Sequence, residues 1–118
     1  GTTARVSITH GRRWAVAAAG HVERLGVDLC EVARAPNVAR ISRRFLADEE
    51  RALPACAADW ATLWALKEAA CKALRLGVFD GGLRASRVAA LAPARYAWLA
   101  LTVAVEVGAE DVVVVAYD

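Results

Sequence analysis

The stretch Trp60–Leu74 constrains the fold more than any other part of this 118-residue chain. It is rich in Ala and Leu and contains neither Gly nor Pro, so it predicts a helix of about four turns. Asp59 stands where a helix N-cap is expected, and Gly77 stands where a terminating glycine is expected. The fold should therefore be built around one long central helix.

This helix has two contrasting faces when successive residues are placed about 100° apart. The apolar face, which should meet the core, comprises Leu63, Leu66, Ala70, Ala73 and Leu74. The second face comprises Trp64, Glu68, Cys71, Lys72 and Arg75. Glu68 and Lys72 are i,i+4 neighbours with the acid first, which favours an ordinary surface ion pair. The same face could instead present a carboxylate, an ammonium group and an aromatic wall to a ligand.

Composition narrows the class of protein. Hydrophobic residues make up 58% of the chain, but 28 of them are Ala, and only two of its 15 basic residues are Lys. No run reaches the ~18 apolar residues of a transmembrane helix, and residues 2–13 lack the apolar core of a signal peptide. We expect one domain over residues 1–118 and no membrane partner. The chain starts with Gly and lacks Met, which suggests a processed start, a tag scar or a domain of a longer protein.

Cysteine usage and net charge exclude further classes. Cys30, Cys56 and Cys71 show no CxxC spacing, which argues against a zinc site and a disulfide framework and favours a reducing, cytoplasmic setting. A net charge of +2 does not require a nucleic-acid partner. A small Arg-rich nucleic-acid-binding domain remains a weaker alternative, since the tryptophans occupy positions that look like core.

Alternation and turn residues predict strands on both sides of the helix. The first three, expected to form an antiparallel sheet, are Ala4–Thr9, Trp14–Ala19 and Arg24–Leu29. The last three, which follow a glycine-containing loop at 77–82, are Ser86–Leu91, Tyr96–Val107 and Asp111–Tyr117. Between the two sets we expect a helix over Val38–Phe45 and a short one capped by Asp48 and ending near Leu53. This order predicts an α+β fold, an antiparallel sheet packed with a long helix.

Asp28 is unusual because aspartate is depleted in strands and its neighbours are apolar. It could face water at a sheet edge or cap the following turn. It could also be a metal-binding carboxylate at a strand end.

Three separated segments together carry a resemblance to a known family. They are Val-Ser-Ile-Thr-His (6–10), Gly-Val-Asp-Leu-Cys-Glu (26–31) and Trp-Ala-Leu-Lys-Glu-Ala-Ala-Cys-Lys (64–72), with Arg-Phe-Leu-Ala-Asp-Glu-Glu (44–50) between the last two. This combination resembles the 4′-phosphopantetheinyl transferase superfamily over about residues 5–77. The C-terminal strands fit the family's outline without a motif.

The resemblance implies transfer of the phosphopantetheine arm of coenzyme A to a serine of an acyl or peptidyl carrier protein, with Mg²⁺. Asp28 and Glu68 would be the metal ligands, since Mg²⁺ prefers oxygen donors and commonly uses one or two carboxylates. Lys72, one turn further on, would contact the pyrophosphate. Glu68, directly or through a bound water, would accept the serine proton. Charge stabilisation and positioning should contribute most to the rate.

The resemblance implies further contacts. His10 and Lys67 would contact coenzyme A, although His10 alone could be a solvated turn residue. Arg34 matches a position that meets acidic carrier-protein helices in short members of the family. Arg40, Arg43 and Arg44 could extend that basic face or simply form a solvated Arg-rich helix.

Two features depart from the family pattern. Long, two-halved members carry a second acid where this chain has Cys30, whereas short, trimeric members carry an acid at the position of Glu31. The Val6–His10 segment precedes the Asp28 segment, as in long members, so the chain resembles the second half of a long enzyme. We therefore expect either a homo-oligomer or a domain of a larger polyketide or fatty-acid synthase. The alternative is a non-catalytic relative with a structural or carrier-docking role.

Overall fold

The computed structural model describes residues 3–77 and 81–118. The strands are β1 (Arg5–His10), β2 (Ala15–Gly20), β3 (Leu25–Glu31), β4 (Val88–Leu91), β5 (Ala94–Tyr96), β6 (Thr102–Val107) and β7 (Asp111–Tyr117). The α-helices are α1 (Ala35–Arg40), α2 (Asp48–Arg51), α3 (Ala57–Leu74) and α4 (Leu83–Ala85). Two 3₁₀ turns, η1 (Val32–Arg34) and η2 (Ser42–Arg44), lie beside α1.

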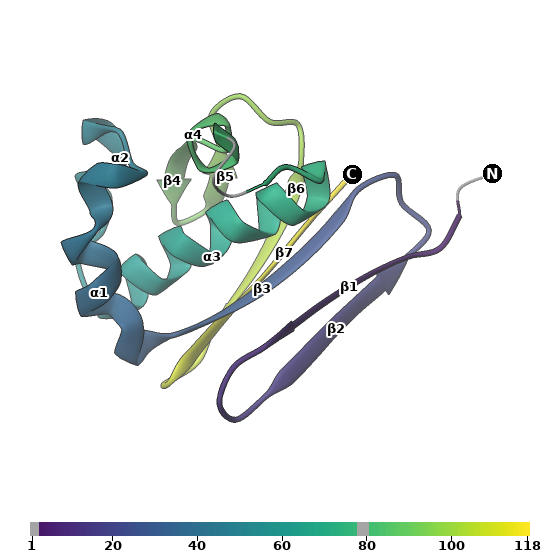
Figure 1. The fold of residues 1–118 in the computed structure, drawn as a ribbon, viewed down its shortest axis with the longest axis horizontal. Coiled ribbons are helices and arrows are strands. Elements are labelled where there is room, and N and C mark those ends of the chain that lie inside the picture. Colours follow the sequence, from purple (N-terminus) through teal and green to yellow (C-terminus); the bar gives the residue numbers. More distant parts are fainter. Residues whose placement is uncertain (1–2, 78–80) are drawn as a thin grey trace.

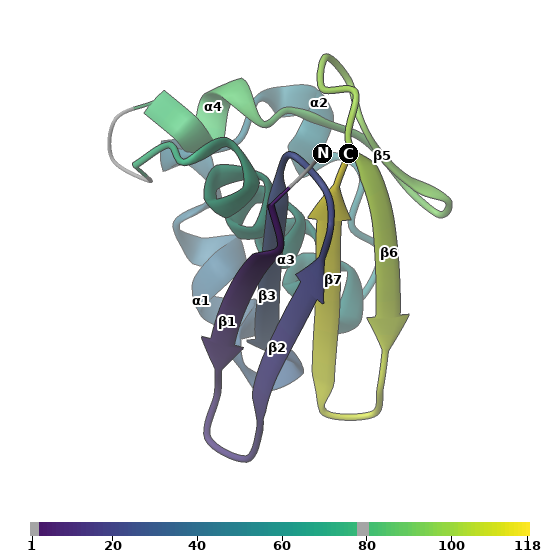
Figure 2. The same cartoon turned by 90° about the vertical axis from the view of Figure 1, so that its right-hand side faces the viewer.

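The long helix α3 lies across an antiparallel sheet of order β3-β7-β6 (Figures 1 and 2). The two-stranded ribbon β4–β5 lies on the other side of α3, and α1 and α2 lie beyond one of its ends (Figure 1). Because several elements surround α3, most of it is buried. The core residues that it contributes are Ala61, Leu63, Ala65, Leu66, Ala69, Ala70 and Cys71. The expected α+β architecture is confirmed.

Gly26 sets the distance between β3 and α3. A Cβ atom at this position would lie 2.0 Å from the carbonyl oxygen of Ala69 and 2.7 Å from the backbone nitrogen of Ala73. Both atoms belong to the backbone of α3 and cannot move aside without shifting the helix. The glycine two residues before Asp28 therefore lets the helix approach the strand closely.

We expect Gly26→Ala to destabilise the protein by about 3 kcal/mol, because the added methyl group overpacks a backbone contact. The free energy of unfolding from denaturant titration measures this effect. Gly20→Ala is the matched control, because no atom lies within 4 Å of the position of its Cβ. Equal stability of the two variants would contradict the close approach of α3.

The limits of α3 differ from those that the sequence predicts. The helix begins at Ala57, so Cys56 rather than Asp59 is the N-cap, and Asp59 instead accepts a hydrogen bond from the backbone N–H of Ala55 at 2.9 Å. At the other end, the C-cap is Arg75 in the left-handed region, with φ of 55°, rather than Gly77. The helix therefore begins about one turn before the predicted start, and Asp59 lies within its first turn.

Other element boundaries also needed correction. The predicted helix over Val38–Phe45 is α1, which ends at Arg40, followed by the turn η2. Asp48 is the first residue of α2 rather than its cap, and α2 ends at Arg51. The predicted strand over Tyr96–Val107 is two strands, β5 and β6, because the hydroxyl of Tyr96 donates to the carbonyl of Leu66 at 2.6 Å and fixes this point to α3. Part of the predicted 77–82 loop lies outside the described residues.

The N-terminal hairpin is attached to the sheet in an unexpected way. Within the described residues, β1 pairs through its backbone only with β2, while β3 pairs with β7. The side-chain oxygens of Ser7 and Thr9 accept hydrogen bonds from the backbone N–H groups of Val27 and Leu29, at 3.0 and 3.3 Å. The residue offset is the same in both bonds, so β1 runs parallel to β3. The prediction of one sheet from the first three strands is therefore wrong.

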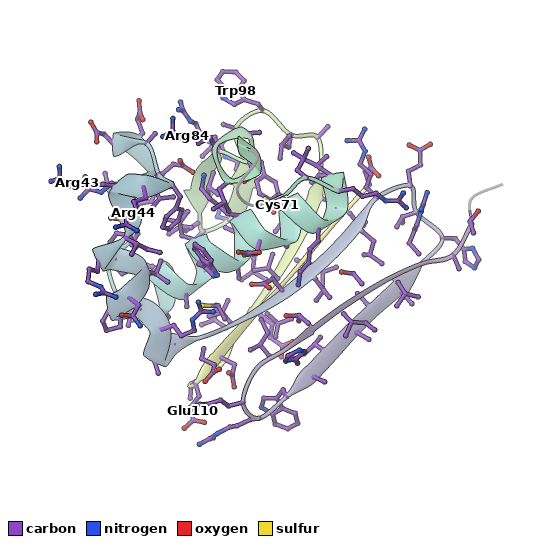
Figure 3. The ribbon with its side chains drawn as sticks, viewed as in Figure 1. Arg43, Arg44, Cys71, Arg84, Trp98 and Glu110 are labelled. Carbon is purple, nitrogen blue, oxygen red and sulfur yellow. The ribbon has the colours of Figure 1, made fainter. Side chains whose placement is uncertain are left out.

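The tryptophans divide into two groups. Trp60 and Trp64 pack against the core, whereas Trp14 and Trp98 are 62% and 79% exposed, so the expectation that all four look like core is wrong for these two. Figure 3 shows Trp98 at the outer edge of the molecule. Among the described residues, no helix has the length and apolar character needed to span a membrane.

Candidate functional site

Asp28 and Lys72 meet where α3 crosses β3. Lys72 donates to the backbone carbonyl of Val27 at 2.9 Å and to Oδ1 of Asp28 at 3.3 Å. Asp28 is only 8% exposed, which excludes the solvent-facing edge role considered for it. Lys72 pairs with Asp28, and the structure shows no Glu68–Lys72 contact within hydrogen-bonding distance. The Glu68–Lys72 ion pair that the i,i+4 spacing favours is therefore replaced by a Lys72–Asp28 pair.

Glu68 lies one turn before Lys72 and is half-buried. Burial raises the pKa of the Glu68 carboxyl, and the nearby charge of Asp28 raises it further, while Lys72 and Arg34 oppose the shift. Burial also raises the pKa of Asp28, against the opposing effect of Lys72. The carboxylates of Asp28 and Glu68, from β3 and α3, are thus both partly buried and close enough for the charge of Asp28 to act on Glu68.

The hydroxyl of Thr9 donates to Oδ1 of Asp28 at 3.4 Å, so the end of β1 forms one wall of this place. His10 is the next residue, and strand alternation gives it the opposite, exposed face of β1. Its predicted contact with coenzyme A stays a prediction.

Arg34 follows β3 in the turn η1 and lies beside the same group of residues. Its guanidinium carbon is 5.9 Å from the centre of the Trp64 ring, within range of a cation–π interaction. Its charge lowers the pKa values of Asp28 and Glu68 against the larger effect of burial. Arg34 is exposed, so it remains available to a ligand or a partner.

A groove of about 570 Å³ adjoins Glu68. Its apolar lining comes from Ile41, Phe45, Trp64 and Leu83, and its polar lining from Glu68, Arg44 and Arg84. Phe45 and Trp64 meet edge to face, with ring centres 4.9 Å apart. The aromatic wall expected beside Glu68 is therefore present.

Lys67 lies in a different environment. Its side chain is fully buried, and its Nζ atom lies 2.8 Å from Oε2 of Glu50 and 2.5 Å from the carbonyl oxygen of Leu83. Burial lowers the pKa of Lys67, and the hydrogen bond to Glu50 opposes this. Because Glu50 and Leu83 enclose the ammonium group, it presents no exposed surface here, and its contact with coenzyme A stays a prediction.

Two further arginines that were predicted to bind the carrier protein, Arg40 and Arg44, lie in different environments. Arg44 lines the groove next to Glu68. Arg40 is exposed on α1 and donates to the side chain of Asn37 at 3.2 Å, with no contact to the groove.

Sequence reasoning assigned no role to Thr9, Glu50 or Arg84. Thr9 and Glu50 stand inside motifs already recognised, so their motif positions were a usable signal. Arg84 has no such signal, because it reaches the groove only through the path of the chain after α3.

The comparison with known families agrees with this geometry. A family model described as the 4′-phosphopantetheinyl transferase superfamily matches residues 24–96, more than half of the chain. The chain belongs to this superfamily. The match includes Asp28, Glu68 and Lys72, and it ends at the close of β5. No curated protein matches this phosphopantetheinyl transferase-like chain.

The raised pKa of Glu68 predicts a pH-dependent cost of its ionisation. Its native-state pKa exceeds that of the unfolded chain, about 4.3, so the wild type should lose stability relative to Glu68→Gln as pH rises through the interval between the two values. Without divalent cations, Glu68→Gln should therefore unfold at higher denaturant concentration than the wild type at pH 7. The difference should shrink toward pH 4. A pH-independent difference would contradict the assigned desolvation.

Proposed function

We propose that this chain transfers 4′-phosphopantetheine from coenzyme A to a serine hydroxyl of an acyl or peptidyl carrier protein, with Mg²⁺ as cofactor. The observation that supports the proposal best is the meeting of Asp28, Glu68 and Lys72. Asp28 comes from the family segment at 26–31, and Glu68 and Lys72 come from the segment at 64–72. Together they supply two neighbouring carboxylates and one ammonium group.

The donor set suits Mg²⁺. Among the residues that the structure describes, no group of three or more His, Cys, Asp or Glu side chains could hold a metal ion, so a site here would rest on the two carboxylates of Asp28 and Glu68. Mg²⁺ commonly takes one or two carboxylates and completes its shell with phosphate oxygens and water. Burial and, after it, the nearby charge of Asp28 raise the pKa of Glu68, and a bound dication would oppose that shift. When bound, Mg²⁺ would supply positive charge to the pyrophosphate of coenzyme A.

The side chains of this chain would carry the remaining steps. Lys72 would bind a pyrophosphate oxygen, for which its exposed portion beside Asp28 is well placed. Glu68 would accept the proton of the serine hydroxyl, directly or through a bound water. The serine oxygen forms a bond to the phosphorus that bears pantetheine, and the bond from that phosphorus to the bridging oxygen breaks. Adenosine 3′,5′-bisphosphate leaves.

The carrier protein would approach over Arg34 and Arg44. Both are exposed, and both flank Trp64, so acidic groups of the carrier could bind there while its serine reaches Glu68. Arg40 would contribute only long-range charge. The transfer could involve a second copy of the chain or further parts of a larger synthase.

The test is the mass of an apo acyl carrier protein after incubation with this chain, coenzyme A and Mg²⁺. A gain equal to phosphopantetheine, dependent on Mg²⁺, supports the proposal. No gain with coenzyme A still bound would indicate that the site needs another chain. No gain and no binding would favour a non-catalytic, structural member of the superfamily.

A further inference from the structure

Four arginines surround a second cavity at the far end of the groove. This pocket, of about 220 Å³, is lined by Arg43, Arg44, Arg84 and Arg87 together with Phe45 and Glu50. Figure 3 shows Arg43, Arg44 and Arg84 at the end of the molecule that carries α2. Within residues 3–77 and 81–118, none of the four guanidinium groups has a hydrogen-bond or ion-pair partner. The pocket therefore holds uncompensated positive charge.

The buried Glu50–Lys67 pair holds the two arginine-bearing segments in place. Oε1 of Glu50 accepts from the backbone N–H of Ala47, and Oε2 accepts from that of Val88, at 3.1 and 3.0 Å. Lys67 and the hydroxyl of Ser86 both donate to the carbonyl of Leu83. Arg43 and Arg44 precede Ala47, and Arg84 and Arg87 lie between Leu83 and Val88. Because Lys67 neutralises Glu50, the carboxylate positions the arginines without cancelling their charge.

The pocket and the apolar groove adjoin each other. They share Arg44, Phe45 and Arg84 as lining residues. Glu68 lines the groove, and Arg43 and Arg87 line only the pocket. A ligand that fits both would have an uncharged arm starting near Glu68 and an anionic group at its far end.

We propose that this composite site binds carboxylate-terminated acyl thioesters of coenzyme A, with the uncharged pantetheine arm in the groove and the acyl carboxylate in the arginine pocket. The inference rests on the proposed function, which puts the pyrophosphate at Asp28, Glu68 and Lys72. Beyond the pyrophosphate the arm is uncharged up to its thioester, so on the pantetheine side of the ligand an anion can come only from the acyl group. Planar guanidinium groups suit a carboxylate because they can donate two parallel hydrogen bonds.

The experiment compares succinyl- and butyryl-coenzyme A, which have the same acyl length and differ in the terminal carboxylate. Binding is measured by calorimetry with Mg²⁺, and transfer is measured at saturating apo carrier protein. We expect the wild type to bind succinyl-coenzyme A at least about tenfold more tightly, in line with one charge-assisted hydrogen bond. Arg87→Gln, which changes a residue of the pocket alone, should reduce this preference without weakening butyryl-coenzyme A, and Arg84→Gln should reduce the preference as well. The control, Arg95→Gln, removes an exposed arginine that lines neither cavity.

Three results would overturn the proposal. The wild type could bind both donors equally, or its preference could survive both substitutions. Alternatively, Arg84→Gln and Arg87→Gln could raise the KM for the carrier protein equally with both donors, which would assign the arginines to carrier docking. Each of these leaves the proposed transferase function intact. If neither donor binds nor is transferred, the proposed function itself fails.

Discussion

Glu68→Gln should lower the rate of phosphopantetheine transfer by about 100-fold or more, because it removes both a proposed metal ligand and the proposed general base. Asp28→Asn should have a similar effect through the metal. Both substitutions keep the size of the side chain and remove an ionisation that burial makes costly, so neither should unfold the protein. The measurements are the kcat for holo carrier formation and the Mg²⁺ concentration at half-maximal rate.

Glu31→Gln is the matched control for these two variants. Glu31 also lies on β3, but its carboxylate accepts a hydrogen bond from the backbone N–H of Arg12 and is absent from the Asp28 group. It should retain most of the wild-type rate. If Glu31→Gln were as inactive as Glu68→Gln, the metal site would have to include Glu31 at the end of β3, the position at which short members of the family also carry an acid.

Lys67→Met should destabilise the protein by about 3–5 kcal/mol, the range observed when one partner of a buried ion pair is removed. Both side chains are almost completely enclosed, so the substitution would leave the Glu50 carboxylate charged and without its lysine. It would also remove a donor from the carbonyl of Leu83. The measurement is the free energy of unfolding at pH 7 from denaturant titration.

A double variant distinguishes the charge from the packing. The double variant Glu50→Gln/Lys67→Met carries no buried charge at this position. Its loss of unfolding free energy should therefore be smaller than the sum of the losses in the two single variants. Asp48→Asn, which removes an exposed partner of Arg51 at 3.9 Å, should have little effect. A Lys67→Met variant as stable as Asp48→Asn would show that Lys67 is not enclosed.

Much of the fold could be predicted because its signals are local. Strand alternation placed β1, β2, β3 and β7 within two residues, and the Ala- and Leu-rich segment placed α3. Strand pairing was not local. The partner of β3 is β7, whose residues lie 80 or more positions away in sequence, and the first hairpin is joined to β3 by side chains. Periodicity identifies a strand but contains no information about which edge it joins.

In the candidate site, too, the features that depend on local sequence could be predicted and those that depend on distant contacts could not. Motif positions predicted that Asp28, Glu68 and Lys72 belong together, and the structure brings them to one place. They assigned both Lys67 and Lys72 to coenzyme A, whereas α3 turns Lys67 to the interior and Lys72 toward Val27 and Asp28 of β3. Nor did they predict the arginine pocket, because Arg43 and Arg84 become neighbours only after the chain folds back across α3.

The attachment of the first hairpin gives the protein an adjustable wall. Backbone pairing between two strands is indifferent to side chains, so it survives most substitutions. Here the hydroxyls of Ser7 and Thr9, rather than backbone carbonyls, accept hydrogen bonds from β3. The position of the hairpin relative to β3 therefore depends on two small residues. Selection could therefore shift the β1 wall against Asp28 through single substitutions while β3, β7 and β6 stay intact. Ligand preference and sheet stability are thereby left to evolve on separate residues.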